Sequence, residues 1–405
     1  MLKRSIEAEV RAFLKIMPVV LVIGARQTGK TTLMESLMQE NGWHYVTFDD
    51  QMALSLARQA PASWLDSLPK PLIIDEVQRL PEIFLSIKRD VDKNKEPGRY
   101  LLTGSANPLL LPNLGDSLAG RTGVLTLYPL SQGEIRQKKE HFLEHIFSDK
   151  VKFVPVEPEN DFYGMILRGG FPSLLKLEDL EDANRWIRSY LQTMLERDVR
   201  DISNIQGLRD LPRLFQLLAT RSANLLNVSE LSRTIGLVNV TLQRYLRLLE
   251  TVFFIHTLPA WSSNLGKRLT RSPKIHVCDT AVMAQLLDID EVRLKSDPNL
   301  FGQFLESFVF AELMKQKSWS SIHCQLFHFR DLDKEVDFII ERTDGSIVGV
   351  EVKSSKQIHT SDLKGLLYLK ERFPNFRYGV IFYLGKEIQF LGEKLVALPL
   401  EYLWH

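Results

Sequence analysis

Short apolar runs separated by polar, helix-compatible stretches make up the first third of the chain. Five of them are bounded by Gly, Pro or Asp: MPVVLVIG, WHYVTFDD, PLIIDEV, GRYLLTGSA and GVLTLYPL. Apolar runs of this length are typical of strands buried on both faces, and helical segments between them favour a parallel sheet. The pattern predicts an α/β core over residues 1–133. Its opening segment, MLKRSIEAEVRAFLKIMP, has charged and apolar residues at helical spacing, which predicts an amphipathic helix rather than a signal peptide.

The hydrophobic period changes twice after this core. Residues 134–204 contain long amphipathic stretches interrupted by GGFP, which predict a helical lid. Residues 205–290 contain three helix-like periods, and Asn227 and Asn239 are expected to cap the last two helices. Residues 291–405 return to a mixed pattern, with a helix at FGQFLESFVFAELMKQ and strands at QLFHFR, EVDFIIER, SIVGVEVK and RYGVIFYL.

Composition restricts the class of partner more than the class of fold. Hydrophobic residues make up 44% and charged residues 25% of the chain, as in ordinary globular proteins. The formal net charge of +1 excludes a wholly electrostatic nucleic-acid binder but allows a local basic surface. Cys278 and Cys324 are isolated, so neither a disulfide framework nor a zinc site is expected, and a reducing cytoplasm fits. No apolar stretch approaches the roughly 18 residues of a membrane span.

A phosphate-binding loop follows the first strand. GARQTGKTT at residues 24–32 has glycine at both ends, which lets backbone N–H groups approach phosphates closely, and a helix N-terminus follows. Lys30 is expected to contact the β- and γ-phosphates of ATP, and Thr31 to offer its hydroxyl to Mg²⁺. The other residues expected to line the nucleotide are Gly24, Ala25, Arg26, Gln27, Thr28, Gly29 and Thr32.

An acidic pair ends the PLIIDEVQ run. Asp75 is expected to hold Mg²⁺ together with Thr31, and Glu76 to orient and deprotonate the attacking water. After the next strand, Ser105 in LLTGSAN stands where ATPases of the AAA+ class carry a polar sensor residue. Arg121 ends SLAGR, where such proteins carry an arginine that reaches a neighbouring subunit's nucleotide. The alternative for Arg121 is an ordinary surface arginine.

The middle region has the size and turn chemistry of a helix-turn-helix. NVSELSRTIGL is followed by NVTLQRYLRLLE, whose helix would present Thr241, Gln243, Arg244 and Arg247 to DNA. The next segment, SSNLGKRLTRSPK, predicts a basic wing that contacts phosphates through Lys267, Arg268, Arg271 and Lys274. The alternative is a lid or an oligomer contact whose charges are merely solvated.

The C-terminal part places three carboxylates and a lysine on suitable elements. Glu306 lies in the helix, Asp337 in EVDFII, and Glu351 and Lys353 on one face of GVEVK. Asp337 and Glu351 are expected to bind Mg²⁺, with Lys353 activating water, as in a metal-dependent phosphodiesterase. Val336 and Phe338 are expected to share the opposite, core-facing side of their strand. The alternative is a solvated face with cross-strand ion pairs.

These motifs together resemble a prokaryotic family of AAA+ ATPases with an AAA-14 domain followed by DUF4143. The resemblance covers nearly the whole chain and rests on GARQTGKTTL, IIDEVQ, LLTGSA, SLAGR, YPLSQGE, LERDVRDI, RSPKIHVCDT, FLESFV, EVDFII and VEVKSS. It implies a restriction-endonuclease-like α/β fold of the PD-(D/E)xK type for residues 291–405. In full, the expected fold is an α/β P-loop AAA+ core, a helical lid, a winged helix-turn-helix and this last domain.

Two hypotheses about function follow. The leading one is a cytoplasmic homo-oligomer, such as a hexamer, that hydrolyses ATP with Mg²⁺ and acts on DNA through a metal-dependent nuclease-like domain. Its rival is an ATPase switch of the signalling type, whose C-terminal fold only binds nucleic acid or a protein partner. Mg²⁺-dependent DNA cleavage that is lost in Asp337→Ala and Lys353→Ala variants would separate the two.

Overall fold

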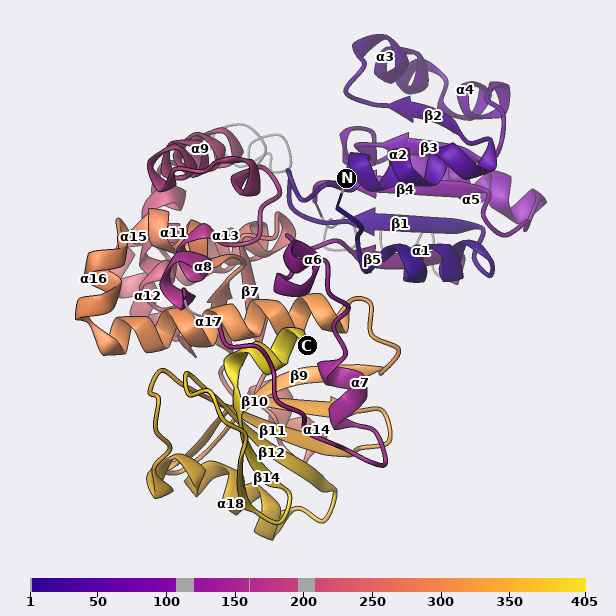
Figure 1. Cartoon of the computed structure of the whole chain (residues 1–405). Helices are drawn as coiled ribbons and strands as arrows, with labels where there is room; N and C mark the ends of the chain where they lie inside the picture. Colours follow the sequence, from indigo (N-terminus) through magenta and orange to yellow (C-terminus); the bar gives the residue numbers. More distant parts are fainter. Residues whose placement is uncertain (1, 107–119, 160, 196–207) are drawn as a thin grey trace. The chain divides into compact units, whose positions relative to one another are not determined.

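The computed structural model describes residues 2–106, 120–159, 161–195 and 208–405 (Figure 1). The chain forms two compact units. The first comprises residues 1–130 together with 171–173 and 247–254, and the second contains the remaining residues. The segments expected to form a lid, a middle region and a C-terminal domain therefore lie almost entirely in the second unit.

The first unit is built on a five-stranded sheet in the order β2-β3-β4-β1-β5, in which every pairing is parallel. Its strands are β1 (Val19–Ile23), β2 (His44–Thr47), β3 (Leu72–Asp75), β4 (Tyr100–Gly104) and β5 (Thr122–Thr126). Its helices are α1 (Glu7–Leu14), α2 (Lys30–Asn41), α3 (Gln51–Gln59), α4 (Pro61–Ser67) and α5 (Ile83–Lys93). The predicted α/β core with a parallel sheet is confirmed, and the predicted first helix is α1.

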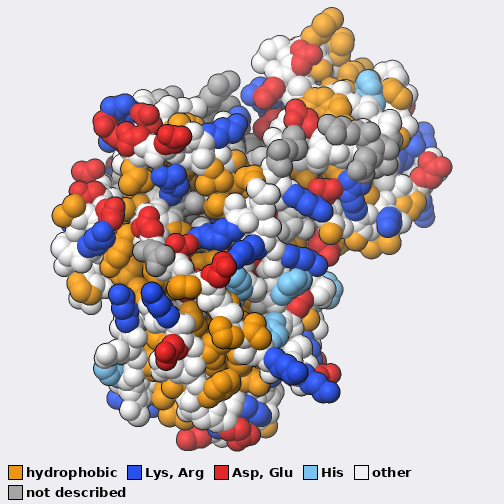
Figure 2. All heavy atoms as spheres, in the orientation of Figure 1, with side chains coloured by type: hydrophobic (Ala, Val, Ile, Leu, Met, Phe, Trp, Pro, Cys, Tyr) orange, Lys and Arg blue, Asp and Glu red, His pale blue; other side chains and the backbone are white. Residues whose placement is uncertain are grey.

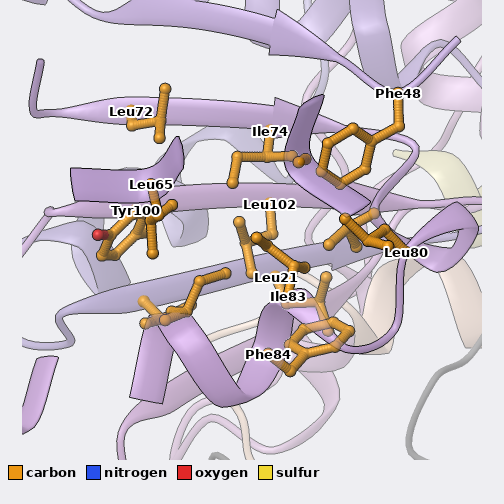
Figure 3. Packing of buried hydrophobic residues seen from close by; sticks show 14 of the residues in the cluster. Leu21, Phe48, Leu65, Leu72, Ile74, Leu80, Ile83, Phe84, Tyr100 and Leu102 are labelled. Atoms are coloured by element: carbon orange, nitrogen blue, oxygen red, sulfur yellow. The ribbon is translucent and has the colours of Figure 1, made fainter. Parts of the chain in front are cut away.

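Apolar side chains from several strands gather on one face of this sheet. Leu21, Ile74 and Leu102 come from three different strands and point to the same side (Figure 3). They pack in one cluster with Ile83 and Phe84 of α5. All five residues of β1 are buried, as expected for a central strand covered on both faces.

The second unit begins with short helices that are attached to a long one. Its first four helices are α6 (Gln132–Arg136), α7 (Phe142–Ile146), α8 (Phe162–Arg168) and α9 (Leu180–Thr193). Ser131 caps α6 and donates a hydrogen bond to Glu140, with 2.5 Å between Oγ and Oε2. The backbone N–H of Gln132 donates to Glu312 of α17 (Pro298–Lys317), and Glu312 pairs with the buried Lys315 at 2.7 Å. A buried polar network thus holds α6 on α17.

The middle of the second unit alternates helices with a small antiparallel sheet of order β6-β8-β7. In chain order its elements are α11 (Leu211–Ala219), β6 (Asn224–Leu225), α12 (Val228–Ile235), α13 (Asn239–Thr251), β7 (Ile255–Leu258), α14 (Leu265–Thr270) and β8 (Lys274–Val277), followed by α15 (Thr280–Leu287) and α16 (Glu291–Ser296). Asn227 caps α12 by accepting the N–H of Glu230, as expected. Asn239 is the first helical residue of α13 instead of its cap.

The C-terminal part is a six-stranded mixed sheet of order β13-β14-β12-β11-β10-β9. Its elements after α17 are β9 (Cys324–Asp331), β10 (Lys334–Arg342), β11 (Ile347–Lys353), α18 (Lys364–Arg372), β12 (Phe376–Tyr383), β13 (Gln389–Gly392) and β14 (Leu395–Pro399). The strands β9, β10 and β11 form an antiparallel meander, and β12 returns parallel to β11 after the crossover helix α18.

A β-bulge in β10 corrects one expectation about this sheet. Its register against β9 shifts between Val336 and Ile339, so strict alternation fails there. Val336 and Ile339 pack in one cluster with Leu366 of α18, while Phe338 stacks on Phe310 of α17. Val336 and Phe338 therefore face different helices, although the alternation of apolar residues placed them together. Asp337 lies inside the bulge.

Across the parts of the chain that the structure describes, no helix is long and apolar enough to cross a membrane.

Candidate functional site

The predicted phosphate-binding loop connects β1 to the N-terminus of α2. A Cβ atom on Gly24 would lie 2.1 Å from the carbonyl oxygen of Leu127, so only glycine fits there. Gly29 has a φ of 92°, a conformation that glycine adopts without strain. Lys30 is buried, and its Nζ donates to the carbonyl oxygens of Gly24 and Ala25, each at 2.9 Å. The loop therefore closes around its own lysine.

The remaining loop residues lie where the sequence places them. Thr28 is fully buried and donates to the carbonyl oxygen of Ala25 at 2.9 Å, which tightens the turn. Arg26 is partly buried, and Gln27, Thr31 and Thr32 are exposed. These exposed groups stand at the start of α2, where a helix N-terminus favours a bound anion.

Arg4, which no sequence motif singled out, stabilises the phosphate-binding loop through hydrogen bonds. Its guanidinium is buried and donates to the carbonyl oxygens of Thr28 at 2.6 Å and Tyr128 at 2.7 Å. It thereby ties the phosphate-binding loop to the segment after β5. No local pattern could have revealed this role, because the two partners lie 24 and 124 residues away in sequence.

Asp75 ends β3 among neutral hydroxyl donors. Its Oδ2 accepts from Thr31 Oγ1 and from Tyr45 OH, both at 2.9 Å, and its Oδ1 accepts from Thr103 Oγ1. Burial raises the pKa of Tyr45 above its ordinary value, and the neighbouring Asp75 carboxylate adds to the shift. Thr31 and Asp75, predicted as a metal-binding pair, are thus in direct contact. Tyr45 is a further partner of Asp75 that the sequence analysis did not identify.

Glu76 has a left-handed backbone conformation, with φ 56° and ψ 43°, which costs energy in any residue other than glycine. Its Oε2 accepts hydrogen bonds from Gln78 Nε2 and from Ser105 Oγ, the latter at 3.2 Å. Gln78 also donates to Ser105 Oγ at 2.7 Å. The predicted sensor residue Ser105 therefore touches the predicted base directly. Gln78 belongs to the PLIIDEVQ motif, and its place two residues after Glu76 was the signal available for it.

Arg121, predicted to reach a neighbouring subunit's nucleotide, has another partner in this structure. Arg121 pairs with Asp92, with 2.6 Å between Nε and Oδ1, on a partly exposed surface. Arg168 donates to the backbone carbonyl oxygens of Leu177 and Glu178, which suits a structural role. The region around 107–119, which contains most of SLAGR, lies outside the described residues, as does LERDVRDI from 196 onward.

The residues predicted to contact DNA divide into an exposed group and a buried one. Gln243, Arg244 and Arg247 of α13 are exposed, Thr241 is partly buried, and Lys267 on α14 is exposed. Arg271 is half-buried and donates to the carbonyl oxygen of Arg330. On the face drawn in Figure 2, Lys and Arg side chains lie among Asp and Glu side chains instead of forming one basic field.

The positions of Arg268 and Lys274 contradict the prediction of a basic wing. Arg268 forms a two-pronged ion pair with Glu341, at 2.5 and 2.8 Å, and its guanidinium lies over the ring of Trp261. Lys274 is only 3% exposed. Both cations are turned inward and neutralised by carboxylates, so neither offers a charge to a phosphate backbone.

The predicted C-terminal carboxylates do converge, but on a lysine. Lys274 Nζ lies 2.8 Å from Glu306 Oε1, 3.0 Å from Glu335 Oε1 and 3.5 Å from Asp337 Oδ1. The other oxygen of Asp337 accepts the backbone N–H of Val352 at 2.9 Å. Glu351 is buried and pairs with Lys353 at 3.4 Å. We call Glu306, Glu335, Asp337, Glu351, Lys274 and Lys353 the carboxylate–lysine cluster.

Burial and mutual repulsion govern the protonation of this cluster. Burial raises the pKa of Glu306 to about 8, and the charge of Asp337 adds to the shift. The pKa of Glu351 is also raised by burial and by Asp337. Burial lowers the pKa of Lys274, but the surrounding carboxylates more than compensate, so that it stays above the ordinary value. Lys274 is therefore a permanent cation.

The residues present do not fit the divalent metal predicted at Asp337 and Glu351. Mg²⁺ needs about six oxygen ligands at about 2.0–2.1 Å, whereas the ammonium group of Lys274 already lies against Asp337 and that of Lys353 against Glu351. Over the described residues, no group of three or more His, Cys, Asp or Glu side chains is arranged to hold a metal ion. The prediction of a Mg²⁺ site at Asp337 and Glu351 is corrected accordingly.

Three family models match consecutive parts of this chain. A model described as an AAA domain matches residues 17–136. Two described as domains of unknown function, DUF8612 and DUF4143, match residues 159–293 and 301–403. The expected AAA and DUF4143 segments are confirmed, and DUF8612 was not anticipated. Residues 17–136 thus form an AAA domain of the P-loop ATPase type, which implies nucleotide binding.

Relatives of similar length occur in distant organisms. The uncharacterized proteins Mb2031c of Mycobacterium bovis and Rv2008c of Mycobacterium tuberculosis are each 31% identical over 402 residues, covering 98% of this chain and 83% of theirs. The uncharacterized protein MJ1544 of Methanocaldococcus jannaschii is 23% identical over 342 residues, covering 81% of this chain and 73% of its own. Among solved structures, the Walker-type ATPase paby2304 of Pyrococcus abyssi aligns with a TM-score of 0.46 and 15% identity, over 71% of this chain and 96% of that one.

Proposed function

This chain belongs to the same protein family as Mb2031c and Rv2008c, and we propose that it is an ATP-hydrolysing switch that acts on nucleic acid. The observation that carries the ATPase part is the pair of contacts at the ends of β3 and β4, Thr31 with Asp75 and Glu76 with Ser105. These contacts gather a metal-binding pair and a general base beside the phosphate-binding loop.

Each residue of the site has a separate task in this proposal. The N–H groups of the loop bind the phosphates, and Lys30 exchanges its contacts with the Gly24 and Ala25 carbonyl oxygens for phosphate oxygens. Thr31 and Asp75 would hold Mg²⁺, which supplies neutralisation of the phosphate charge. Glu76 orients and deprotonates water, while Gln78 and Ser105 fix its carboxylate.

Nucleotide binding is tested separately from turnover. A Lys30→Ala variant should lose ATP binding in a fluorescent-nucleotide titration, because the loop loses its only lysine. Lys93→Ala makes the same change at an exposed position of α5 and serves as the control. Wild-type affinity in Lys30→Ala would contradict the assignment of this loop as the nucleotide site.

The nucleic-acid part of the proposal rests on the middle of the second unit. The order α11-β6-α12-α13-β7-α14-β8, with its antiparallel sheet, supports the proposal of a winged helix, in which α13 would be the recognition helix. Its exposed Gln243, Arg244 and Arg247 are available for contact. The competing function for this module, a lid or an oligomer contact, is supported by the inward turn of Arg268 and Lys274.

A DNA-binding titration discriminates between these uses of α13. Arg244→Ala should weaken binding of duplex DNA several-fold and reduce its salt dependence, because one phosphate or base contact is lost. Arg233→Ala on the exposed side of α12 changes the charge equally and serves as the control. Equal affinity of wild type and Arg244→Ala for every DNA tested would remove α13 from the proposal.

A nuclease-like C-terminal domain is the second candidate, favoured by one observation. A helix, a three-stranded meander, a crossover helix and a parallel strand follow each other as in restriction-endonuclease-like folds, and Glu306, Asp337, Glu351 and Lys353 converge there. Glu306 and Asp337 already pair with Lys274, and Glu351 pairs with Lys353, so we favour a binding role for this domain over cleavage. Mg²⁺- or Mn²⁺-dependent cutting of plasmid or branched DNA by wild type, lost in Asp337→Ala and Lys353→Ala, would reverse that choice.

Assembly is proposed from Arg121. If Arg121 serves a neighbouring subunit's nucleotide, Arg121→Ala should bind ATP normally but turn it over at least 10-fold more slowly. Asp92→Ala removes the present partner of Arg121 and should leave turnover intact. Full turnover in Arg121→Ala would mean that Arg121 only forms a surface ion pair. The argument for a homo-oligomer such as a hexamer would then be lost.

A further inference from the structure

Lys274 lies among the carboxylates of the C-terminal segment, but it comes from an earlier segment of the chain. It begins β8, the middle strand of the small sheet, and belongs to the segment matched by DUF8612. Its partners Glu306, Glu335 and Asp337 lie on α17 and β10, in the segment matched by DUF4143. The cation and the carboxylates thus come from two different family segments within one compact unit.

The ammonium group matches its surroundings in charge and in hydrogen-bonding capacity. A lysine has three N–H donors, and three carboxylate oxygens lie between 2.8 and 3.5 Å from Nζ. Beyond it in β8, His276 stacks on Phe310 of α17 with 4.1 Å between ring centroids, which fixes the strand against the same helix. Lys274 is therefore held in place by packing as well as by charge.

Several of the carboxylate oxygens that a metal would need already have partners. Asp337 has one oxygen on Lys274 and the other on the backbone N–H of Val352. Glu351 is paired with Lys353, and Glu306 with Lys274. A divalent cation could enter only by displacing an ammonium group that is nine-tenths and more buried.

We infer that the ammonium of Lys274 is the resident cation of the carboxylate–lysine cluster and that it excludes divalent metal from the C-terminal domain. The inference stands apart from ATP hydrolysis, since it concerns the second unit and needs no nucleotide. It also predicts that removing this one charge lets a divalent cation bind near Glu306 and Asp337, because these carboxylates then lack their cation.

Binding of Mn²⁺, measured by electron paramagnetic resonance without nucleotide, tests the inference. All proteins carry Thr31→Ala, so that the phosphate-binding site contributes no metal. Lys274→Met keeps the length of the side chain and removes its charge, and should gain one Mn²⁺ site with an affinity at least 10-fold above wild type. Mn²⁺ should also raise the melting temperature of Lys274→Met and leave that of wild type unchanged.

Two matched variants identify the site. Lys267→Met makes the same charge change on an exposed residue of α14 and should bind no more Mn²⁺ than wild type. Lys274→Met combined with Asp337→Asn should lose the gained site. Mn²⁺ bound at the cluster in wild type, recognised by its loss in Asp337→Asn, would overturn the inference, as would a folded Lys274→Met that gains no Mn²⁺.

The wild-type titration decides the matter even if Lys274→Met does not fold. A wild-type protein whose Mn²⁺ binding is unchanged by Asp337→Asn supports exclusion of metal by the lysine. A wild-type protein that loses a Mn²⁺ site on that substitution contradicts it.

Discussion

Asp75 in the first unit and Asp337 in the second were both predicted to hold Mg²⁺, yet their surroundings differ in kind. Asp75 accepts hydrogen bonds from the hydroxyls of Thr31, Tyr45 and Thr103. Asp337 instead faces the ammonium of Lys274. Neutral donors orient a carboxylate without cancelling its charge, whereas a lysine cancels it. The comparison teaches that the partners of a carboxylate, more than its position on a fold, decide whether it is available to a metal.

The largest expected effect is on turnover at the first of these sites. Glu76→Gln keeps the size of the side chain but cannot accept a proton, so kcat should fall by about 10²–10⁴-fold while ATP binding persists. A coupled ATPase assay measures the first and a nucleotide titration the second. Glu371→Gln makes the same change at an exposed position and is the control. Near-normal kcat in Glu76→Gln would remove the assignment of the general base.

The next largest effect is expected on the free energy of unfolding, which should respond differently to changes at Asp75 and at the carboxylate–lysine cluster. Lys274→Met leaves buried carboxylates without their cation and should cost about 3–5 kcal/mol of unfolding free energy in metal-free buffer. Tyr45→Phe, which removes one neutral donor from Asp75, should cost only about 1 kcal/mol. Urea denaturation followed by circular dichroism measures both. Equal losses would mean that cationic and neutral partners are equivalent here.

A smaller effect concerns pH and a third carboxylate. Burial raises the pKa of Glu140 to about 8, and the charge of Glu312 adds to the shift. An acid with a raised pKa keeps its proton in the folded state while the unfolded chain loses it. The stabilisation is therefore fully present below about pH 4.5 and is lost as the pH rises to about 8. The loss should be on the order of a few kcal/mol.

Denaturation at pH 5.5 and pH 8 checks this pH dependence. Glu140→Gln mimics the protonated acid and should reduce the slope, with Glu306 contributing part of what remains, whereas Glu371→Gln, at an exposed position, should leave the slope unchanged. A variant Glu140→Gln with the wild-type slope would show that Glu140 does not contribute to the pH dependence.

The smallest effect is expected at Arg4. Arg4→Met removes the donor to the carbonyl oxygens of Thr28 and Tyr128 and should cost about 1–3 kcal/mol, because two buried acceptors lose their partner. Nucleotide affinity should fall several-fold, since the loop loses its brace. Arg11→Met, on the partly exposed face of α1, is the control. Unchanged stability would show that other groups hold the loop.

Contiguous features of the molecule could be predicted from the sequence. The residues 24–32 act together in space because they are adjacent in the chain, and the run of apolar residues before them can only be a buried strand. Asp75 was identified for the same reason, since it ends such a run. These features follow from the local sequence, because the residues that form them are adjacent and backbone geometry fixes their relative positions.

Features made by distant segments could not be predicted. Lys274 looked like part of a solvated basic loop, because its partner Glu306 lies 32 residues away. The bulge near Asp337 was also hidden, since alternation of apolar residues reads the same with or without one extra residue in the ladder. A sequence pattern does not show which charged side chains are buried, whereas the structure does.

The position of Lys274 in β8 has a consequence for the transfer of one segment without the other. A recombination that carried residues 301–403 alone to another protein would transfer the acidic residues and leave behind the lysine that neutralises them. The recipient would have to supply a new positive charge or recruit a metal. In this chain the ion pairs of Lys274 therefore couple two segments that are matched by separate family models.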